Sequence, residues 1–411
     1  MKSIRQYTLG LLFSVINFPA FLVVATMSRI FKSVKKPRTY NVFWGTEPIL
    51  NNFHWAQATK SYFTQSVFIT RADSFILNGR ADIVLFSERI KSSVFSRVLK
   101  SLHDNFIFVL AFIRVLLQGN LVCFSCDGFV FQNYRSFGFN YKLEFYLFKL
   151  AKISVCVMPY GADSYVYSKV HDKNWLYGLI TDYPMAARRQ RNIQRRVDFY
   201  VRKSDFFLPG QMLFDGFGRS DWITPSTLCV EVSTESRKRR SNSATLVVTH
   251  APNHREVKGT RFIIEAVNQL INEGLPIELR LLERKPNHEV IRVLTEESDV
   301  HIDQLFFDGY ALNALESMSL GVPTIGNFAG PTRDFFDRWS FTSECPIIIA
   351  NEKTLTTVLR NLCSDREQLE AVSLDSSAYV HKYHSYAYFA EQFSKMILAS
   401  SPEYREWIAK H

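Results

Sequence analysis

Two cationic side chains lie where a strand-to-helix connection would let them bind a phosphorylated ligand. Arg255 and Lys258 follow a strand-like run that ends at Val248, and a helical pattern begins at Thr260. Such a loop lies at the carboxyl end of a strand, where open α/β sheets bind ligands, and the helix after it directs free N–H groups to the same place. The two cations together would hold a diphosphate and stabilise its charge as it leaves. The alternative is that both are surface side chains of a polar loop.

Two carboxylates follow further along the chain. Asp308 and Glu316 are separated by seven residues, the first in a loop and the second within a helical run beside Leu315 and Met318. A carboxylate among apolar neighbours costs free energy unless it is paired or bound, and vicinal ribose hydroxyls are suitable partners for Glu316. We expect Asp308 to contact a sugar hydroxyl, and backbone N–H groups of residues 310–313 to meet phosphates. The residues of this segment that we predict to bind the phosphorylated ligand, besides Asp308, are Gly309, Tyr310, Ala311, Leu312, Asn313 and Glu316.

An alternation of strand-like and helical runs positions these residues. It predicts two successive α/β domains, each with a parallel sheet and crossover helices. Thr260 is expected to cap its helix, and glycines to end the helices at Gly274 and Gly321. The predicted strands are 40–44, 66–69, 83–86, 121–124, 154–157, 245–248, 277–282, 300–305 and 323–325, and the predicted helices include 51–63, 105–117, 260–273, 288–297, 312–320 and 386–407.

A change of composition marks the boundary between the two domains. Apolar residues vanish between Val232 and Ser243, where Ser, Thr, Asn, Lys and Arg dominate, as in an interdomain linker. The predicted organisation is therefore an apolar and basic segment (1–39), an N-terminal Rossmann-like domain (40–231), a linker (232–244), a C-terminal Rossmann-like domain (245–380) and a final helix (381–411).

The first segment predicts an association with a membrane surface. No charged side chain occurs from Gln6 to Ser28, and basic residues flank this run, including Lys35, Lys36 and Arg38 after it. The run is long enough to span a bilayer, although Pro19 near its centre favours an interfacial or kinked anchor. A cleaved signal peptide lacks a clear cleavage site here, and a buried helix of the fold is the remaining alternative.

The composition narrows the class of partner. The chain has 411 residues and a net charge of +10, which favours anionic partners such as lipid or phosphorylated substrates. No zinc-finger spacing, aromatic RNA-binding motif or basic zipper region is found, so a nucleic-acid partner is not expected. The pair Cys123 and Cys126 invites a redox or zinc interpretation, but no second pair completes such a site, and buried structural thiols are expected.

Residues 245–326 resemble the donor-binding domain of retaining GT-B glycosyltransferases of family 4. The usual pattern of that family is Glu-x7-Glu, then Ala-Met-x-x-Gly-x-Pro, with an Arg and a Lys in the loop that opens the domain. The chain has Asp308-x7-Glu316, then Met318, Gly321 and Pro323 at matching positions. It departs from the pattern in having Asp at the first acidic position and Ala311 where glycine is common.

The resemblance implies an α/β protein of the GT-B class, with two Rossmann-like, doubly wound domains facing a cleft. Arg255 and Lys258 would hold the donor diphosphate, Glu316 the ribose and Asp308 the donor sugar, and no metal would be needed. Gly45 resembles part of the family's first loop and is assigned to the donor. On the acceptor side we expect Gly161, Asp163 and His54.

The expected function is transfer of a sugar, with retention of configuration, from a nucleotide-sugar donor to a lipid-linked saccharide or polysaccharide. The resemblance to enzymes of bacterial surface polysaccharide synthesis, with the apolar N-terminal segment, suggests the cytoplasmic face of the inner or plasma membrane. No bound cofactor is expected besides the donor substrate. A same-fold enzyme with a soluble acceptor or with epimerase chemistry, and a non-catalytic nucleotide-sugar-binding protein, are the alternatives.

Overall fold

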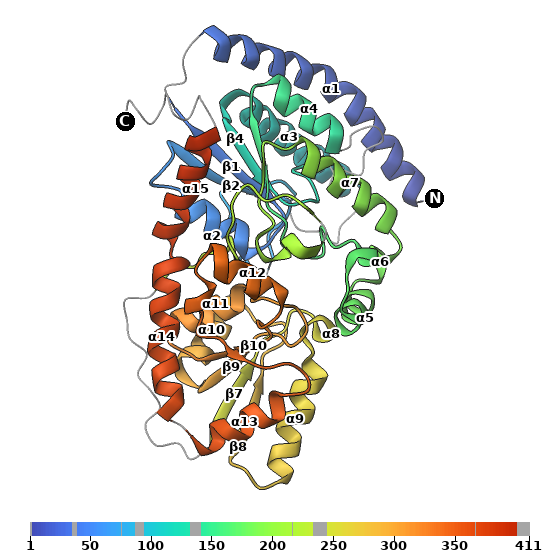
Figure 1. Ribbon diagram of the computed structural model, residues 1–411. Helices are drawn as coiled ribbons and strands as arrows, with labels where there is room; N and C mark the ends of the chain where they lie inside the picture. Colours follow the sequence, from blue (N-terminus) through green and yellow to red (C-terminus); the bar gives the residue numbers. More distant parts are fainter. Residues whose placement is uncertain are drawn as a thin grey trace. The chain divides into compact units, whose positions relative to one another are not determined.

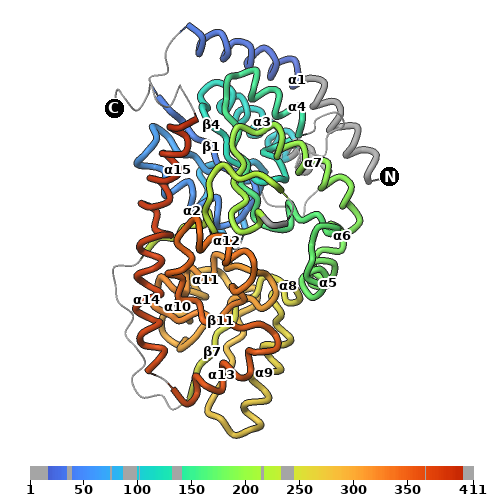
Figure 2. The backbone as a smooth tube through the Cα atoms, in the orientation of Figure 1, coloured from blue at the N-terminus to red at the C-terminus, as the bar shows by residue number. Residues whose placement is uncertain are grey.

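The computed structural model describes residues 2–34, 39–74, 76–86, 94–131, 141–215, 217–232, 245–365 and 367–400. The chain divides into two compact units, each built around a parallel sheet with helices packed on it (Figures 1 and 2). Unit 1 comprises Met1–Ser164, Arg195–Leu208 and Ala390–His411, and unit 2 comprises Tyr165–Gln194 and Pro209–Phe389.

The sheet of unit 1 has the strand order β3-β2-β1-β4-β5-β6, with every neighbouring pair parallel. Both faces of a parallel sheet are covered, so its strands are continuous apolar runs rather than alternating ones. The order reverses between β1 and β4, the position at which doubly wound sheets bind ligands. The strands are β1 (Asn41–Thr46), β2 (Gln65–Thr70), β3 (Ile83–Val84), β4 (Leu121–Phe124), β5 (Ser154–Val157) and β6 (Phe206–Phe207).

The helices of unit 1 include the apolar N-terminal segment, α1, which packs against α3 and α4. Phe21 of α1 is fully buried, with its ring 4.9 Å from that of Phe112, and the Lys32 ammonium donates hydrogen bonds to the carbonyls of Gly119 and Ala151. These carbonyls lie just past the ends of α3 and α4, where a cation is favoured. The helices are α1 (Lys2–Val34), α2 (Leu50–Ala58), α3 (Val94–Gln118), α4 (Tyr141–Leu150), the later part of α7 (Gln190–Lys203) and the later part of α15 (Tyr386–Ser400).

The sheet of unit 2 has the order β11-β10-β9-β7-β8 and is also parallel throughout. Its order reverses between β7 and β9. The strands are β7 (Leu246–His250), β8 (Ile277–Leu281), β9 (Val300–Ile302), β10 (Thr324–Gly326) and β11 (Ile348–Ile349).

Helices and short 3-10 turns surround this second sheet. The helices are α5 (Lys173–Asp182), α6 (Pro184–Ala187), α8 (Arg255–Lys258), α9 (Thr260–Asn272), α10 (Asn287–Glu296), α11 (Leu312–Ser319), α12 (Pro331–Trp339), α13 (Leu355–Ser364) and α14 (Glu367–Tyr383); the 3-10 turns are η1 (Tyr167–Lys169), η2 (Gly210–Asp215) and η3 (Thr342–Glu344).

The predicted elements recur with small shifts, and three details of the prediction are wrong. The predicted loop at residues 255–258 is a single helical turn, α8. Thr260 does not cap α9, because the cap residue is Gly259 and the Thr260 hydroxyl pairs with the His250 ring. Strand β9 ends at Ile302, three residues earlier than predicted. The glycine prediction holds at Gly321, which follows α11 with a φ of 70°.

The compact units divide the chain differently from the predicted domain boundaries. Residues 165–194 and 209–231, predicted within the N-terminal domain, belong to unit 2, and residues from Ala390 onwards belong to unit 1. Phe393 of α15 packs in unit 1, with its ring 5.4 Å from that of Trp44. The predicted linker lies almost wholly outside the described residues, as do residues 401–411.

Two further expectations from the sequence, about the apolar N-terminal run and about the cysteines, can be compared with the structure. No helix among the described residues is long and apolar enough to cross a bilayer. The cysteines are free, and Cys123 lies beside Cys156 of the neighbouring strand, where burial raises the pKa of the Cys123 thiol well above its usual value. This placement agrees with the expected structural thiols.

Candidate functional site

The candidate residues of unit 2 gather at the carboxyl edge of its sheet. Parallel strands all end at one edge, so the loops after β7, β8, β9 and β10 lie along it, and the strand order reverses there between β7 and β9. Arg255 and Lys258 follow β7, Asp308 follows β9, and Glu316 lies in the helix after that loop.

Lys258 is held in a buried ion pair. Its ammonium Nζ lies 2.7 Å from Asp303 Oδ1 and 3.1 Å from Gln304 Oε1, and both Lys258 and Asp303 are less than a tenth exposed. Burial raises the pKa of the Asp303 carboxyl, but the Lys258 ammonium and the Ala311 N–H outweigh it, so the net pKa is lowered. Asp303 is therefore an anion that fixes the Lys258 cation where the strand order reverses between β7 and β9.

Polar side chains lock the turn that precedes α11. Asp303 Oδ2 accepts a hydrogen bond of 2.8 Å from the Ala311 N–H, and Gln304 Nε2 donates to the Gly309 carbonyl at 3.0 Å. Gln211 brackets Tyr310, accepting from its N–H and donating to its carbonyl. The backbone of residues 309–311 is thus fixed by three buried or half-buried side chains.

These contacts correct the prediction about backbone donors. The N–H groups of Tyr310 and Ala311 already donate within the protein, and the Gly309 N–H donates to two carbonyls. Among the residues that the structure describes, the N–H groups of Leu312 and Asn313 have no acceptor. The first turn of α11 therefore keeps two of the predicted donors for a ligand.

Asn313 and Glu316 attach α11 to its neighbours at the same edge. Asn313 Nδ2 donates to the Ala251 carbonyl in the loop after β7, at 3.2 Å. Glu316 is nine-tenths buried, and its Oε1 accepts a hydrogen bond of 2.8 Å from Asn287 at the start of α10. The buried carboxylate thus has an amide partner within the protein, and its assignment to ribose hydroxyls stays a prediction.

Arg255 of α8 forms an exposed, bidentate ion pair with Glu283. Its Nε and Nη2 lie 2.6 and 2.8 Å from the two carboxylate oxygens of Glu283, which follows β8. The turn of α8 is itself held by Asp182 of α5, whose Oδ2 accepts from the Val257 N–H at 2.8 Å. Since an exposed ion pair contributes only about 0–1 kcal/mol, Arg255 can exchange Glu283 for another anion at low cost.

Asp308 has a structural partner that the sequence did not reveal. Its two carboxylate oxygens accept hydrogen bonds from the N–H groups of Gly330 and Thr332, at 3.1 and 2.8 Å. These N–H groups lie at the start of α12, whose N-cap residue is Gly330, so the Asp308 carboxylate supplies the acceptor that glycine lacks, and its negative charge is favoured there. Any contact with a sugar would use the lone pairs that remain on this carboxylate.

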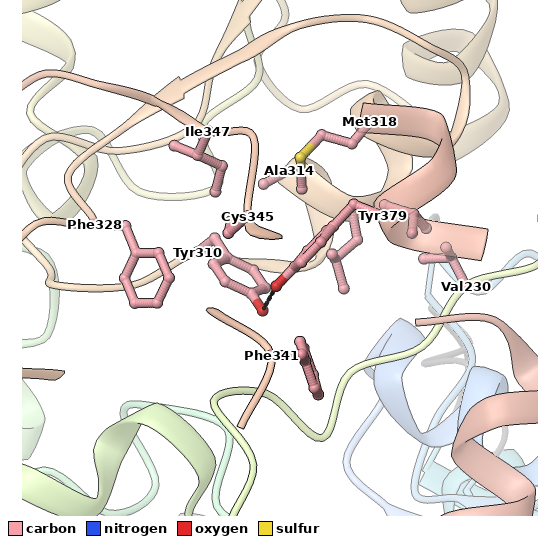
Figure 3. Packing of buried hydrophobic residues seen from close by; sticks show 11 residues of the cluster. Val230, Tyr310, Ala314, Met318, Phe328, Phe341, Cys345, Ile347 and Tyr379 are labelled. Atoms are coloured by element: carbon pink, nitrogen blue, oxygen red, sulfur yellow. Dashed lines mark hydrogen bonds between the residues drawn. The ribbon is translucent and has the colours of Figure 1, made fainter. Parts of the chain in front are cut away.

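The side chain of Tyr310 belongs to the core of unit 2 (Figure 3). Its hydroxyl lies 3.0 Å from the Tyr379 hydroxyl and 3.0 Å from His384 Nε2, and the residue is 1% exposed. Tyr310 therefore anchors the locked turn to the core, while its main chain lies at the sheet edge.

Two buried histidines lie in β7 and β9, His250 at the end of its strand and His301 in the middle of its strand. His250 Nδ1 lies 2.7 Å from the Ile302 carbonyl, and His301 Nδ1 lies 3.2 Å from the Thr249 hydroxyl. Burial lowers the pKa of His250 to about 4 and that of His301 to about 3. Both rings are neutral at physiological pH and connect the two central strands.

Gly45 and His54 lie in unit 1 and are both buried, and their assignments to the donor and the acceptor stay predictions. A Cβ on Gly45 would lie 2.3 Å from the carbonyl oxygen of Ile69 in β2, so any side chain would force β1 and β2 apart. His54 is buried in α2, and burial lowers its pKa to about 4, with the Arg80 charge adding to this.

Asp163 and Gly161 shape the loops after β4 and β5. Asp163 is 2% exposed and accepts hydrogen bonds from the N–H groups of Cys126, Tyr160 and Gly161. Burial, with the neighbouring Asp127 charge, raises the Asp163 pKa to about 7. Gly161 has a φ of 145°, a conformation that favours glycine.

The sequence interpretation missed Asp303, Gln304 and Gln211. The first two were read as part of a strand running to Leu305, although two polar residues directly after a buried apolar run are the signal of a strand end. No sequence signal marks Gln211, which is 99 residues from Tyr310.

Several solved structures have a similar fold, glycosyltransferases among them. A structure of Anabaena HepE in complex with UDP-glucose is 10% identical, has a TM-score of 0.52 and covers 88% of this chain and 100% of its own. WaaG, a glycosyltransferase involved in lipopolysaccharide biosynthesis, has a TM-score of 0.52 at 10% identity, with coverage of 88% and 100%. A glycosyltransferase from Rickettsia africae has a TM-score of 0.52 at 10% identity, with coverage of 91% and 100%.

These likenesses establish the fold, which is GT-B, as the sequence predicted. No protein-family model matches the sequence, and no curated protein matches it in sequence.

Proposed function

We propose that the chain is a glycosyltransferase that uses a nucleotide-sugar donor bound at the carboxyl edge of the sheet of unit 2. The observation that carries this proposal is the convergence there of Lys258, Arg255, the first turn of α11 and the buried Glu316. Two cations and a helix N-terminus suit a diphosphate, and a buried carboxylate suits vicinal hydroxyls of a ribose. UDP is the first nucleotide to test, because the HepE structure of similar fold holds UDP-glucose.

In the proposed reaction, the bond between the anomeric carbon and the diphosphate oxygen breaks, and its electron pair leaves on the nucleoside diphosphate. An acceptor hydroxyl forms the new glycosidic bond and loses its proton. Lys258 and Arg255 stabilise the negative charge that develops on the leaving group. We assign Asp308 to the donor sugar, and a retaining, metal-independent course as in family 4, on the resemblance of the sequence motif.

The acceptor is proposed to be a lipid-linked saccharide or a polysaccharide, reached at the cytoplasmic face of a bacterial membrane. Support comes from α1, whose residues Phe21, Ala25 and Ser28 are buried against the protein while the opposite face stays apolar and exposed. The exposed large side chains of that face are Leu22, Val23, Met27, Ile30, Phe31 and Val34, each between 43% and 77% exposed. Such a face suits the interface of a bilayer.

The donor proposal is tested by thermal-shift titration with UDP, GDP and ADP. A nucleotide at 100 times its dissociation constant should stabilise the protein by about 2.7 kcal/mol. Glu316→Ala should abolish the shift, whereas Glu296→Ala, an exposed carboxylate on α10, should keep it. If no nucleotide stabilises the wild-type protein, or if both variants behave alike, the assigned site is wrong.

Two assays separate the alternatives. Hydrolysis or transfer of a radiolabelled sugar, lost in Lys258→Ala, would exclude a protein that only binds the donor, and transfer to lipid extracts rather than to soluble saccharides would identify the acceptor class. For the membrane, Ile30→Ser with Phe31→Ser should weaken binding to anionic vesicles. Leu374→Ser, which changes an exposed leucine of unit 2, should not.

A further inference from the structure

We propose that Asp303 is a positioning residue of the donor site, which holds the Lys258 ammonium in place and ties it to the first turn of α11. This inference rests on the proposed function and deepens it, because it assigns the part of the site that arranges the groups facing the diphosphate.

This role is supported by the geometry of the Asp303 carboxylate, whose two oxygens bind different partners. Asp303 Oδ1 lies 2.7 Å from Lys258 Nζ, and Asp303 Oδ2 accepts from the Ala311 N–H at 2.8 Å. Lys258 comes from the connection after β7, and Ala311 is the residue before α11. One buried carboxylate therefore fixes the distance between the cation and the helix start on the two sides of the point where the strand order reverses.

Gln304 reinforces the same arrangement. Its Oε1 accepts from Lys258 Nζ at 3.1 Å, and its Nε2 donates to the Gly309 carbonyl at 3.0 Å. The ammonium and the turn before α11 are thus bridged twice by adjacent residues of one strand end. A site fixed before the ligand arrives loses less conformational entropy on binding.

The charge of Asp303 has a second consequence. Lys258 is less than a tenth exposed, and the Asp303 carboxylate, 2.7 Å from its Nζ, offsets the charge of the buried ammonium. An amide at position 303 would lack that charge and would no longer fix the ammonium beside the turn before α11. Removing a negative charge near an anion site should by charge alone strengthen binding, whereas loss of the fixed ammonium should weaken it.

The test is calorimetric titration with UDP at neutral pH, using the wild-type protein, Asp303→Asn and Asp299→Asn. Asp303→Asn should weaken UDP binding about tenfold or more, although it removes a negative charge near the diphosphate. Asp299 is the matched control, because it caps the other end of β9 by accepting from the Val247 N–H, and its replacement should keep the wild-type affinity.

The outcomes are distinct. If the wild-type protein binds UDP and Asp303→Asn binds it as tightly as the wild-type protein or Asp299→Asn does, the inference is overturned. If the wild-type protein binds no nucleotide, the proposed function itself fails. Asp303→Glu serves if Asp303→Asn does not fold: it keeps the charge but displaces the carboxylate, so affinity should fall about tenfold. Unchanged affinity in Asp303→Glu would also refute the positioning role.

Discussion

Replacing Lys258 by Met should destabilise unit 2 strongly at neutral pH. The methionine keeps the length of the apolar stem and removes only the ammonium, so packing is nearly preserved. Asp303, 3% exposed, then keeps the Ala311 N–H as its hydrogen-bond donor but has no cation beside it. Breaking a buried ion pair by removing one partner costs about 3–5 kcal/mol, because the remaining charge is uncompensated.

The pH dependence of this loss follows from the sign of the Asp303 shift. In the wild-type protein the folded-state pKa of Asp303 is lowered, so its contribution to stability is present above the unfolded value near 3.8 and is lost as pH falls through the folded one. Without Lys258, burial raises the pKa of Asp303 instead, and the folded state of the variant is weakened as pH rises. The difference between the two proteins should therefore be small at pH 4 and large at pH 7.

The assay is urea unfolding at both pH values for Lys258→Met, Asp303→Asn and the double variant. Because the two single changes share one contact, their effects should not add, and the double variant should be more stable than the sum of the single losses by about 1–3 kcal/mol. A loss below about 1 kcal/mol for Lys258→Met at pH 7, or additive single effects, would refute the buried ion pair as described.

Three further changes have defined outcomes. Gly45→Ala should destabilise the protein by about 1–3 kcal/mol or more in urea unfolding, because its Cβ would overlap the Ile69 carbonyl; an unchanged midpoint would contradict this packing. His250→Gln should make the free energy of unfolding less sensitive to acid. The pKa of His250 is about 4 in the folded protein and 6.5 in the unfolded chain, so the wild-type protein loses about 2 kcal/mol of stability between pH 7.5 and pH 5 through this residue. Parallel curves of stability against pH for the two proteins would exclude this. Tyr379→Phe should cost about 1 kcal/mol of stability, since it removes a hydrogen bond to the Tyr310 hydroxyl, and should leave UDP affinity unchanged; weaker binding would show that the core cluster reaches the donor site.

Local pattern was sufficient to predict most of the secondary structure. Continuous apolar runs identified β4 and β5, and the helical spacing of Ile263, Ala266 and Leu270 identified the buried face of α9. These features depend on neighbours within a few residues, where period and turn residues are decisive. The same local signals placed Arg255 and Lys258 between a strand and a helix.

Hydrogen-bond partners that are distant in sequence could not be predicted from local patterns. Asp308 is assigned to the donor sugar from its place in the sequence motif, and only the structure shows that its oxygens also accept hydrogen bonds from the N–H groups of residues 330 and 332. A carboxylate at a strand end can bind a ligand and also hold a neighbouring loop, and the path of the later chain decides which loop it meets. The position of residues 165–194 in unit 2 also depends on contacts between residues distant in sequence. Helix α5 packs against α8, and Asp182 of α5 accepts a hydrogen bond from an N–H group of α8.

The sequence by itself determined the alternation of strands and helices, the α/β class and the cationic and acidic residues near the strand ends, because these follow from periodicity and residue type. Only the tertiary structure decided which residues act together. Lys258 meets Asp303 at 2.7 Å across 45 residues, and Gln211 brackets Tyr310 across 99. The physical reason is that strand order is not sequence order: β9 lies beside β7, and that adjacency creates the buried ion pair.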